Sequence, residues 1–237
     1  MTASLLKKKD RYGIFRRVKE INLFLILCNN TQKRKEKKLN IILLGGFLGS
    51  GKTTILIQLA HYIISKENPQ PGETKVMIIE NEIGEVGVDN VLLESGGLTV
   101  QNLFAGCACC TSSGTLLVDI ANIRDEYNPS WIIIEATGVA YPKQIQELIK
   151  GSLGYDMKIL SLADASRWER LRKNLPALID AQVDCADCVL INKADLVDQA
   201  LLDEIAADIK EANPGGKIYF TNAKEQLDEE IWSSIVD

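Results

Sequence analysis

Residues 45–54 read GGFLGSGKTT, and within them Gly46 to Thr53 fit the pattern G-x-x-x-x-G-K-[ST]. An apolar run precedes this stretch and a helical pattern follows it, which is the context in which the pattern is informative. Glycines let the backbone curl so that successive N–H groups point at phosphate oxygens, and a helix start adds the positive end of its dipole. A glycine-rich turn that binds nothing is the alternative, disfavoured because motif and context occur together. We therefore predict a phosphate-binding loop.

The residues of this loop have distinct expected roles. Lys52 is expected to reach the outer phosphates, and Thr53 is expected to offer its hydroxyl to Mg²⁺. The backbone from 49 to 54 is expected to stabilise charge that develops on the phosphates. The loop residues expected to contact nucleotide are Gly46, Gly49, Ser50, Gly51, Lys52, Thr53 and Thr54.

Short apolar runs alternate with helical patterns from Leu39 onward, which is the rhythm of a parallel sheet with crossover helices. The runs carry little polar alternation, as expected of strands buried on both faces. We predict a single-domain α/β fold of the P-loop NTPase type, with a mainly parallel, doubly wound sheet flanked by helices. The expected strands are residues 39–44, 75–80, 98–103, 131–136, 157–164, 188–192 and 217–221; the expected helices are 52–65, 114–127, 143–150, 177–185, 201–212 and 227–236.

A second motif, Asn192-Lys193-Ala194-Asp195, follows the apolar run CVLI. The Asp195 carboxylate can accept hydrogen bonds from the N1–H and amino groups of guanine, whereas adenine presents an acceptor there. The motif therefore favours GTP over ATP. After the last expected strand, the backbone N–H of Ala223 is a candidate to contact the guanine carbonyl, although a simple polar turn explains that segment equally well.

The segment Glu135 to Gly138, EATG, ends the expected strand at 131–136. A carboxylate in this position can hold the Mg²⁺ shell through water, and Gly138 lets the chain approach a γ-phosphate. A buried strand-end carboxylate that caps the next loop is the less favoured alternative. We expect Lys52, Thr53 and Glu135 to act in catalysis, with Thr53 and Glu135 holding Mg²⁺.

Three of the six cysteines, Cys107, Cys109 and Cys110, lie on one short stretch, FAGCACCTSSG. Inert packing explains three clustered thiols poorly. Thiolates bind soft or borderline metals, and adjacent thiolates repel one another without a cation, so we favour a transition-metal site over a redox set. Three thiols leave an incomplete shell, for which Glu82 or Glu85 is a candidate ligand. Each glutamate could equally be a surface loop charge.

The remaining cysteines and the single histidine point to no site. Cys185 and Cys188 form a C-x-x-C between an expected helix and an expected strand, and we interpret them as core residues. His61 is expected at the surface. The spread of cysteines does not resemble a secreted disulfide framework, so we expect a reducing, cytoplasmic setting.

The charge is distributed unevenly along the 237 residues, whose net charge is -5. Residues 1–40 carry 12 Lys/Arg against 3 Asp/Glu, whereas residues 41–237 carry 15 against 29. We expect residues 1–38 to be a basic, partly disordered extension and 39–237 to be the folded domain. The apolar run at 21–28 is far shorter than the roughly 20 residues that cross a bilayer. We expect neither a transmembrane segment nor a nucleic-acid partner.

Five motifs in this order, GGFLGSGKTT, NEIGEVGVD, GCACC, EATG and NKAD, strongly resemble the CobW-like branch of the CobW/HypB/UreG family of P-loop GTPases. The resemblance implies a GTP-hydrolysing metallochaperone that uses GTP and Mg²⁺ to control delivery of a divalent ion to an apo-metalloenzyme client. It implies Zn²⁺ or Co²⁺, with Ni²⁺ as a further option, at Cys107, Cys109 and Cys110. The segment 81–89 resembles the family's switch, which makes Glu82 the sharper candidate for a further ligand.

The chain departs from many CobW-like proteins because its last helical pattern runs to residue 236 and it has one histidine. We therefore expect no second domain, and a GTP-dependent homodimer becomes plausible. Two other functions are open: a metal sensor whose GTP state reports metal supply, and a P-loop small-molecule kinase, which the NKAD motif disfavours.

Overall fold

The computed structural model describes residues 38–70, 73–80, 98–102 and 113–236, and the statements below concern this part of the chain. Within 98–102 and at residue 113 only the backbone is considered. The expected extension over residues 1–38 lies almost wholly outside the described residues and stays a prediction.

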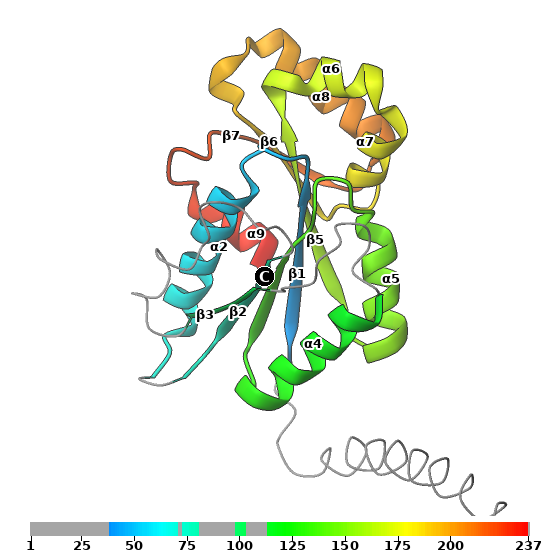
Figure 1. Cartoon of the computed structure of the whole chain (residues 1–237). Helices are drawn as coiled ribbons and strands as arrows, with labels where there is room; N and C mark the ends of the chain where they lie inside the picture. Colours follow the sequence, from blue (N-terminus) through cyan, green and yellow to red (C-terminus); the bar gives the residue numbers. More distant parts are fainter. Residues whose placement is uncertain (1–37, 71–72, 81–97, 103–112, 237) are drawn as a thin grey trace, which may run out of the picture. The chain divides into compact units, whose positions relative to one another are not determined.

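The described chain forms one sheet of seven strands in the order β3-β2-β4-β1-β5-β6-β7, and every neighbouring pair is parallel (Figure 1). The predicted parallel sheet is therefore confirmed, and each of the seven expected strands is present. The strands are β1 (Asn40–Gly46), β2 (Val76–Glu80), β3 (Leu98–Asn102), β4 (Trp131–Glu135), β5 (Met157–Asp164), β6 (Cys188–Asn192) and β7 (Lys217–Thr221).

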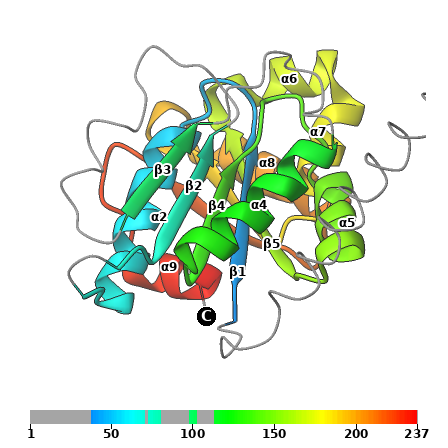
Figure 2. The ribbon, with the colours of Figure 1, turned by 60° about the horizontal axis from the view of Figure 1, so that its bottom comes forward.

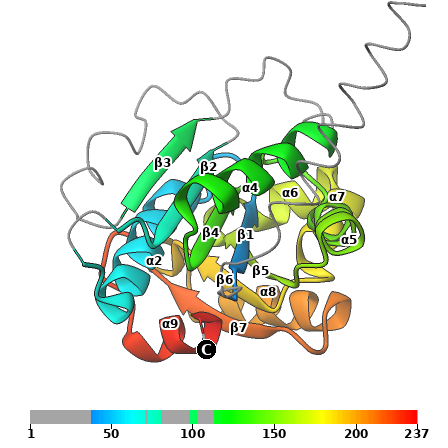
Figure 3. The ribbon, with the colours of Figure 1, turned by 90° about the horizontal axis from the view of Figure 1, so that it is seen from below.

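Helices cover both faces of this sheet, because alternate strand residues point to opposite sides and both sides are apolar. Ile41 and Leu43 of β1 belong to a core shared with α4, α5, α6, α7 and α8, whereas Ile42 and Leu44 belong to a core shared with α2 and α9. Figures 2 and 3 show α4 and α5 on one face of the sheet and α2 and α9 on the other. Burying each such side chain contributes about 1.5–3 kcal/mol. The helices are α2 (Lys52–Glu67), α4 (Ser113–Tyr127), α5 (Pro142–Leu153), α6 (Trp168–Asn174), α7 (Pro176–Val183), α8 (Gln199–Ala212) and α9 (Glu229–Val236).

The short helix α6 has no counterpart among the expected helices. Its sequence, WERLRKN, is mostly charged and too short to show an apolar period. Contacts with other helices hold it: the Trp168 indole N–H donates to Asp208 of α8 at 2.9 Å, and Arg172 binds both Asp180 and Asp208. Tertiary contacts, rather than a local apolar pattern, therefore stabilise this helix.

The glycine-rich loop leaves the carboxyl end of β1, the central strand, which lies between β4 and β5. Buried Gln182 of α7 fixes its start, because the side-chain oxygen accepts from the Gly46 N–H at 2.8 Å. The Gln182 amide nitrogen donates to Ala140 O in the loop after β4. One amide thus ties together the two loops that flank the centre of the sheet. Within the described residues, no helix is both long and apolar enough to cross a membrane.

We expect Gln182→Leu to lower the free energy of unfolding by about 2–4 kcal/mol, since it leaves the buried Gly46 N–H and Ala140 carbonyl without partners. Chemical denaturation measures this loss. The matched control is Gln199→Leu at the exposed start of α8, for which a change within about 0.5 kcal/mol is expected. Equal stability of the two variants would contradict the assigned role of Gln182.

Candidate nucleotide-binding site

Three glycines shape the loop between β1 and α2. Gly46, Gly49 and Gly51 have φ values of 128°, 74° and 101°, a region that side chains strongly disfavour. A Cβ at Gly46 would lie 2.6 Å from Leu162 O, and a Cβ at Gly51 would lie 2.4 Å from the Asn192 amide nitrogen. The glycines are therefore required both for the curl of the backbone and for its close packing.

Lys52, Thr53 and Glu135 meet at the start of α2 and the end of β4. Lys52 is buried, donates to Phe47 O at 3.3 Å and lies 3.9 Å from the Glu135 carboxylate. The exposed Thr53 hydroxyl donates to the other Glu135 oxygen at 3.4 Å. A hydroxyl beside a carboxylate is the oxygen donor set that Mg²⁺ prefers, so these residues fit the ion expected from the sequence.

Gly138 lies against the backbone of the loop. A Cβ at this position would lie 2.7 Å from Leu48 N and 3.3 Å from the Phe47 carbonyl carbon. A side chain here would push the loop after β4 away from the glycine-rich loop. The expected contact of Gly138 with a γ-phosphate stays a prediction, but its contact with the phosphate-loop backbone is direct.

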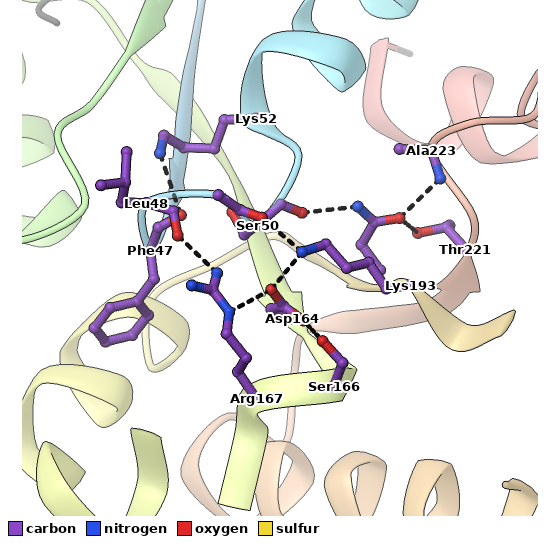
Figure 4. Close-up of polar contacts among 12 residues, drawn as sticks. Phe47, Leu48, Ser50, Lys52, Asp164, Ser166, Arg167, Lys193, Thr221 and Ala223 are labelled. Carbon is purple, nitrogen blue, oxygen red and sulfur yellow. Dashed lines mark hydrogen bonds and ion pairs between the residues drawn. The ribbon is translucent and has the colours of Figure 1, made fainter. Parts of the chain in front are cut away.

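Asn192 is 1% exposed and uses its amide to join two loops. Its nitrogen donates to Ser50 O at 2.7 Å, and its oxygen accepts from the Ala223 N–H at 2.8 Å and from the Thr221 hydroxyl at 3.4 Å (Figure 4). Both Asn192 and the Ala223 N–H therefore already have partners in the protein. Their geometry supports positioning of the site, and the contact of Ala223 with guanine stays a prediction.

Lys193 and Asp195 both follow β6 but have different surroundings. Lys193 has a positive φ of 62°, and its ammonium donates to Gly49 O and to Asp164, each at 2.7 Å. Asp195 lies in the 3-10 turn η2 (Ala194–Leu196) and is exposed. Among the described residues it has no hydrogen-bond or ion-pair partner, so its carboxylate is available to a ligand at this edge of the sheet.

Two residues absent from the sequence prediction complete the network. Asp164, at the end of β5, is 2% exposed and accepts from Lys193, Ser166 and Arg167 (Figure 4). Burial alone would raise the pKa of Asp164, but hydrogen bonds from Lys193, Ser166 and Arg167 outweigh it and hold the pKa below its ordinary value. Arg167, in η1 (Ala165–Arg167), also donates to Leu48 O at 2.6 Å. The only sequence feature that could have identified this pair was an acidic residue, Asp164, at the end of an expected strand on the same edge of the sheet.

Each carbonyl from Phe47 to Ser50 thus accepts from a side chain. The donors are Lys52 to Phe47 O, Arg167 to Leu48 O, Lys193 to Gly49 O and Asn192 to Ser50 O. A peptide whose carbonyl is held on one side turns its N–H to the other, because the trans peptide is planar. The four bonds therefore orient this stretch of backbone.

Gln58 of α2 holds the turn after β7 and was also absent from the sequence prediction. Its amide nitrogen donates to Ala223 O at 3.0 Å and Glu225 O at 2.9 Å, and its oxygen accepts from Leu227 N at 3.1 Å. No motif includes this residue, so no local signal could have identified it.

The predicted transition-metal ligands Glu82, Cys107, Cys109 and Cys110, with the alternative Glu85, lie outside the described residues. Within the described parts of the chain, no group of three or more His, Cys, Asp or Glu is arranged to hold a metal. Burial raises the pKa of the free thiols Cys185 and Cys188 to about 12, which leaves them protonated and unreactive. His61 is exposed, as expected.

Comparisons with known proteins agree with this geometry. The family model for the CobW/HypB/UreG nucleotide-binding domain matches residues 40–220. The zinc-regulated GTPase metalloprotein activator 1 of Dictyostelium discoideum is 28% identical over 244 residues, covering 85% of this chain and 50% of that protein. The zinc chaperone YjiA of Escherichia coli is 32% identical over 173 residues, covering 68% of this chain and 51% of that protein.

The fold has a similar counterpart among solved structures. The crystal structure of zinc-bound YjiA from Escherichia coli matches with a TM-score of 0.59 and 23% identity, covering 82% of this chain and 61% of that one. The chain spans about half the length of the two curated relatives named above. Because the family model matches most of the chain, including its glycine-rich loop and NKAD motif, the chain belongs to the CobW/HypB/UreG family.

Proposed function

We propose that this protein is a Mg²⁺-dependent GTPase that binds a divalent transition metal and delivers it to an apo-metalloenzyme client under nucleotide control. The observation that carries the proposal is the meeting of Lys52, Thr53 and Glu135 beside a phosphate loop in which each carbonyl from Phe47 to Ser50 accepts from a side chain. The GTPase and zinc-chaperone names of its relatives support the same function.

On the nucleotide side, Lys52 and the loop N–H groups would stabilise negative charge on the phosphates. Thr53 and Glu135 would hold Mg²⁺, which neutralises charge that develops as the terminal phosphate is transferred to water. Asp195 would select guanine, since its exposed carboxylate accepts from two adjacent donors on that base. Asn192, Lys193 and Gln58 would keep the base-binding turns in register with the phosphate loop.

On the metal side, Cys107, Cys109 and Cys110 with Glu82 would bind the ion, and zinc is favoured because its relatives are named for zinc. Thiolate ligands select Co²⁺ and Ni²⁺ less strongly than they select Zn²⁺, so these two ions are the less favoured cargo. The ends of β2 and β3 support a link to the nucleotide: Glu80 is in register with Glu135 on one side and with Asn102 on the other. At about 4.8 Å per strand, the backbone of Glu80 lies about 5 Å, and that of Asn102 about 10 Å, from the backbone of Glu135, the residue that would hold Mg²⁺.

Assembly and setting complete the proposal. A GTP-dependent homodimer would suit a chain whose predicted thiol loop supplies an incomplete set of metal ligands. Three clustered thiols require reducing conditions to stay available for metal, so we place the protein in the cytoplasm.

We expect Lys52→Ala to weaken GTP binding by at least about 100-fold, because it removes the buried cation of the phosphate loop and leaves Glu135 without it. Fluorescent GTP-analogue titration and phosphate release measure the effect. Lys66→Ala, at the exposed end of the same helix, is the control and should bind normally. Wild-type affinity in Lys52→Ala would rule out this loop as the phosphate site.

We expect Asp195→Asn to lower GTP affinity by about 100-fold and to raise affinity for XTP. Xanthine carries a carbonyl where guanine carries its amino group, and the asparagine amide can donate to that carbonyl. Competition binding with GTP, XTP and ATP tests this. If ATP is preferred by the unmodified protein, the kinase alternative is favoured instead.

We expect Zn²⁺ affinity, measured by anaerobic titration against a chelator, to be higher with Mg²⁺-GTP than with GDP and to fall at least about 100-fold in Cys109→Ala. Cys185→Ala, which changes a half-buried thiol, is the control and should leave affinity unchanged. Equal Zn²⁺ affinity with Mg²⁺-GTP and with GDP would contradict the coupled mechanism. GTPase rates that are equal with and without metal, and no transfer to any apo-enzyme, would favour the sensor alternative.

A further inference from the structure

Asp164 is a buried carboxylate that holds two cations, and each cation donates to one of two consecutive loop carbonyls. Its Oδ2 atom accepts from Arg167 Nε and Lys193 Nζ, both at 2.7 Å. Lys193 belongs to the NKAD motif, but Arg167 belongs to no motif identified in the sequence. We propose that Arg167 is a positioning residue that orients the Leu48–Gly49 peptide for phosphate binding, an inference that rests on the nucleotide site proposed above.

The Leu48–Gly49 peptide needs such a contact because packing does not hold it. Leu48 is 66% exposed, and Gly49 has a φ of 74° and no side chain to restrict rotation. Arg167 Nη2 donates to Leu48 O at 2.6 Å. Since N–H and C=O point in opposite directions across a trans peptide, this bond turns the Gly49 N–H toward the opposite side, where the phosphates would lie.

Arg167 is itself fixed at both ends. Its Nε–H donates to Asp164, whose side chain is fully buried, while the arginine side chain is 30% exposed. Its backbone immediately precedes α6, which Trp168 anchors to Asp208. The guanidinium therefore connects the end of β5 and a held helix to one carbonyl of the loop.

The chemistry of arginine suits this position better than that of lysine. A guanidinium presents several donors in a rigid plane, so Nε can bind a carboxylate while Nη2 binds a carbonyl. A lysine ammonium is a single point on a flexible stem and would have to satisfy both acceptors from one atom. Arg167→Lys should therefore restore only part of the function.

The experiment compares the full-length protein with Arg167→Ala, Arg167→Lys and Arg170→Ala, using fluorescent GDP and GTP. Arg170 is exposed on α6. Arg170→Ala removes the same charge from a nearby position, so it controls for long-range electrostatic attraction to the nucleotide. We expect Kd for both nucleotides to rise about ten-fold in Arg167→Ala, about three-fold in Arg167→Lys and less than two-fold in Arg170→Ala. In steady-state hydrolysis, KM should rise with Kd while kcat changes by less than about three-fold.

A spectroscopic measurement separates positioning from general stability. The Gly49 amide resonance of the GDP-bound protein should move in Arg167→Ala and return part of the way in Arg167→Lys. Wild-type Kd and an unmoved Gly49 resonance in Arg167→Ala would overturn this inference alone. Failure of the unmodified protein to bind GDP would instead contradict the nucleotide site itself. If Arg167→Ala does not fold, Arg167→Lys is judged by the same two measurements.

Discussion

The site depends on one constraint: backbone N–H groups of the phosphate loop, and not its carbonyls, must point toward a bound anion. Curled glycine-rich backbone has no side chains to enforce this orientation. Here each carbonyl from Phe47 to Ser50 is held by a side chain, and the four donors come from three separate parts of the sheet edge. Tertiary structure therefore fixes an orientation that the loop's own sequence only permits.

Two buried carboxylates make this arrangement possible. Glu135 and Asp164 end the strands on either side of β1; Glu135 lies beside the Lys52 ammonium, and Asp164 binds both Arg167 and Lys193. A carboxylate buried without partners would cost several kcal/mol, so their hydrogen bonds are needed for burial as well as for positioning. The cations thereby gain fixed directions, which is what binding an anion in a defined geometry requires.

The fold could be predicted from the sequence, whereas most of the hydrogen-bond partners within the site could not. The strands β1, β2, β4 and β6 were predicted because burial on both faces leaves a strong apolar signal in the chain. Asp164 was missed because its role follows from register: it pairs with Asn192 across β5 and β6, which brings Lys193 beside it. Gln58 and Gln182 are single amides whose partners lie between 42 and 169 residues away, and such contacts have no local signature. The motifs identify chemical groups, whereas the topology decides which of them meet.

Coupling between nucleotide and metal requires little energy if the geometry is right. A ten-fold change in metal affinity is about 1.4 kcal/mol, comparable with one hydrogen bond made in one nucleotide state and lost in the other. Linkage makes the effect reciprocal, so an ion bound more tightly in the GTP state must favour GTP over GDP by the same factor. In the proposed mechanism, the register of Glu80 between Glu135 and Asn102 would offer a short path for such a change, since a shift at Glu135 would reach the ends of β2 and β3 through adjacent backbone. Metal supply would then bias the nucleotide state as strongly as the nucleotide controls the metal.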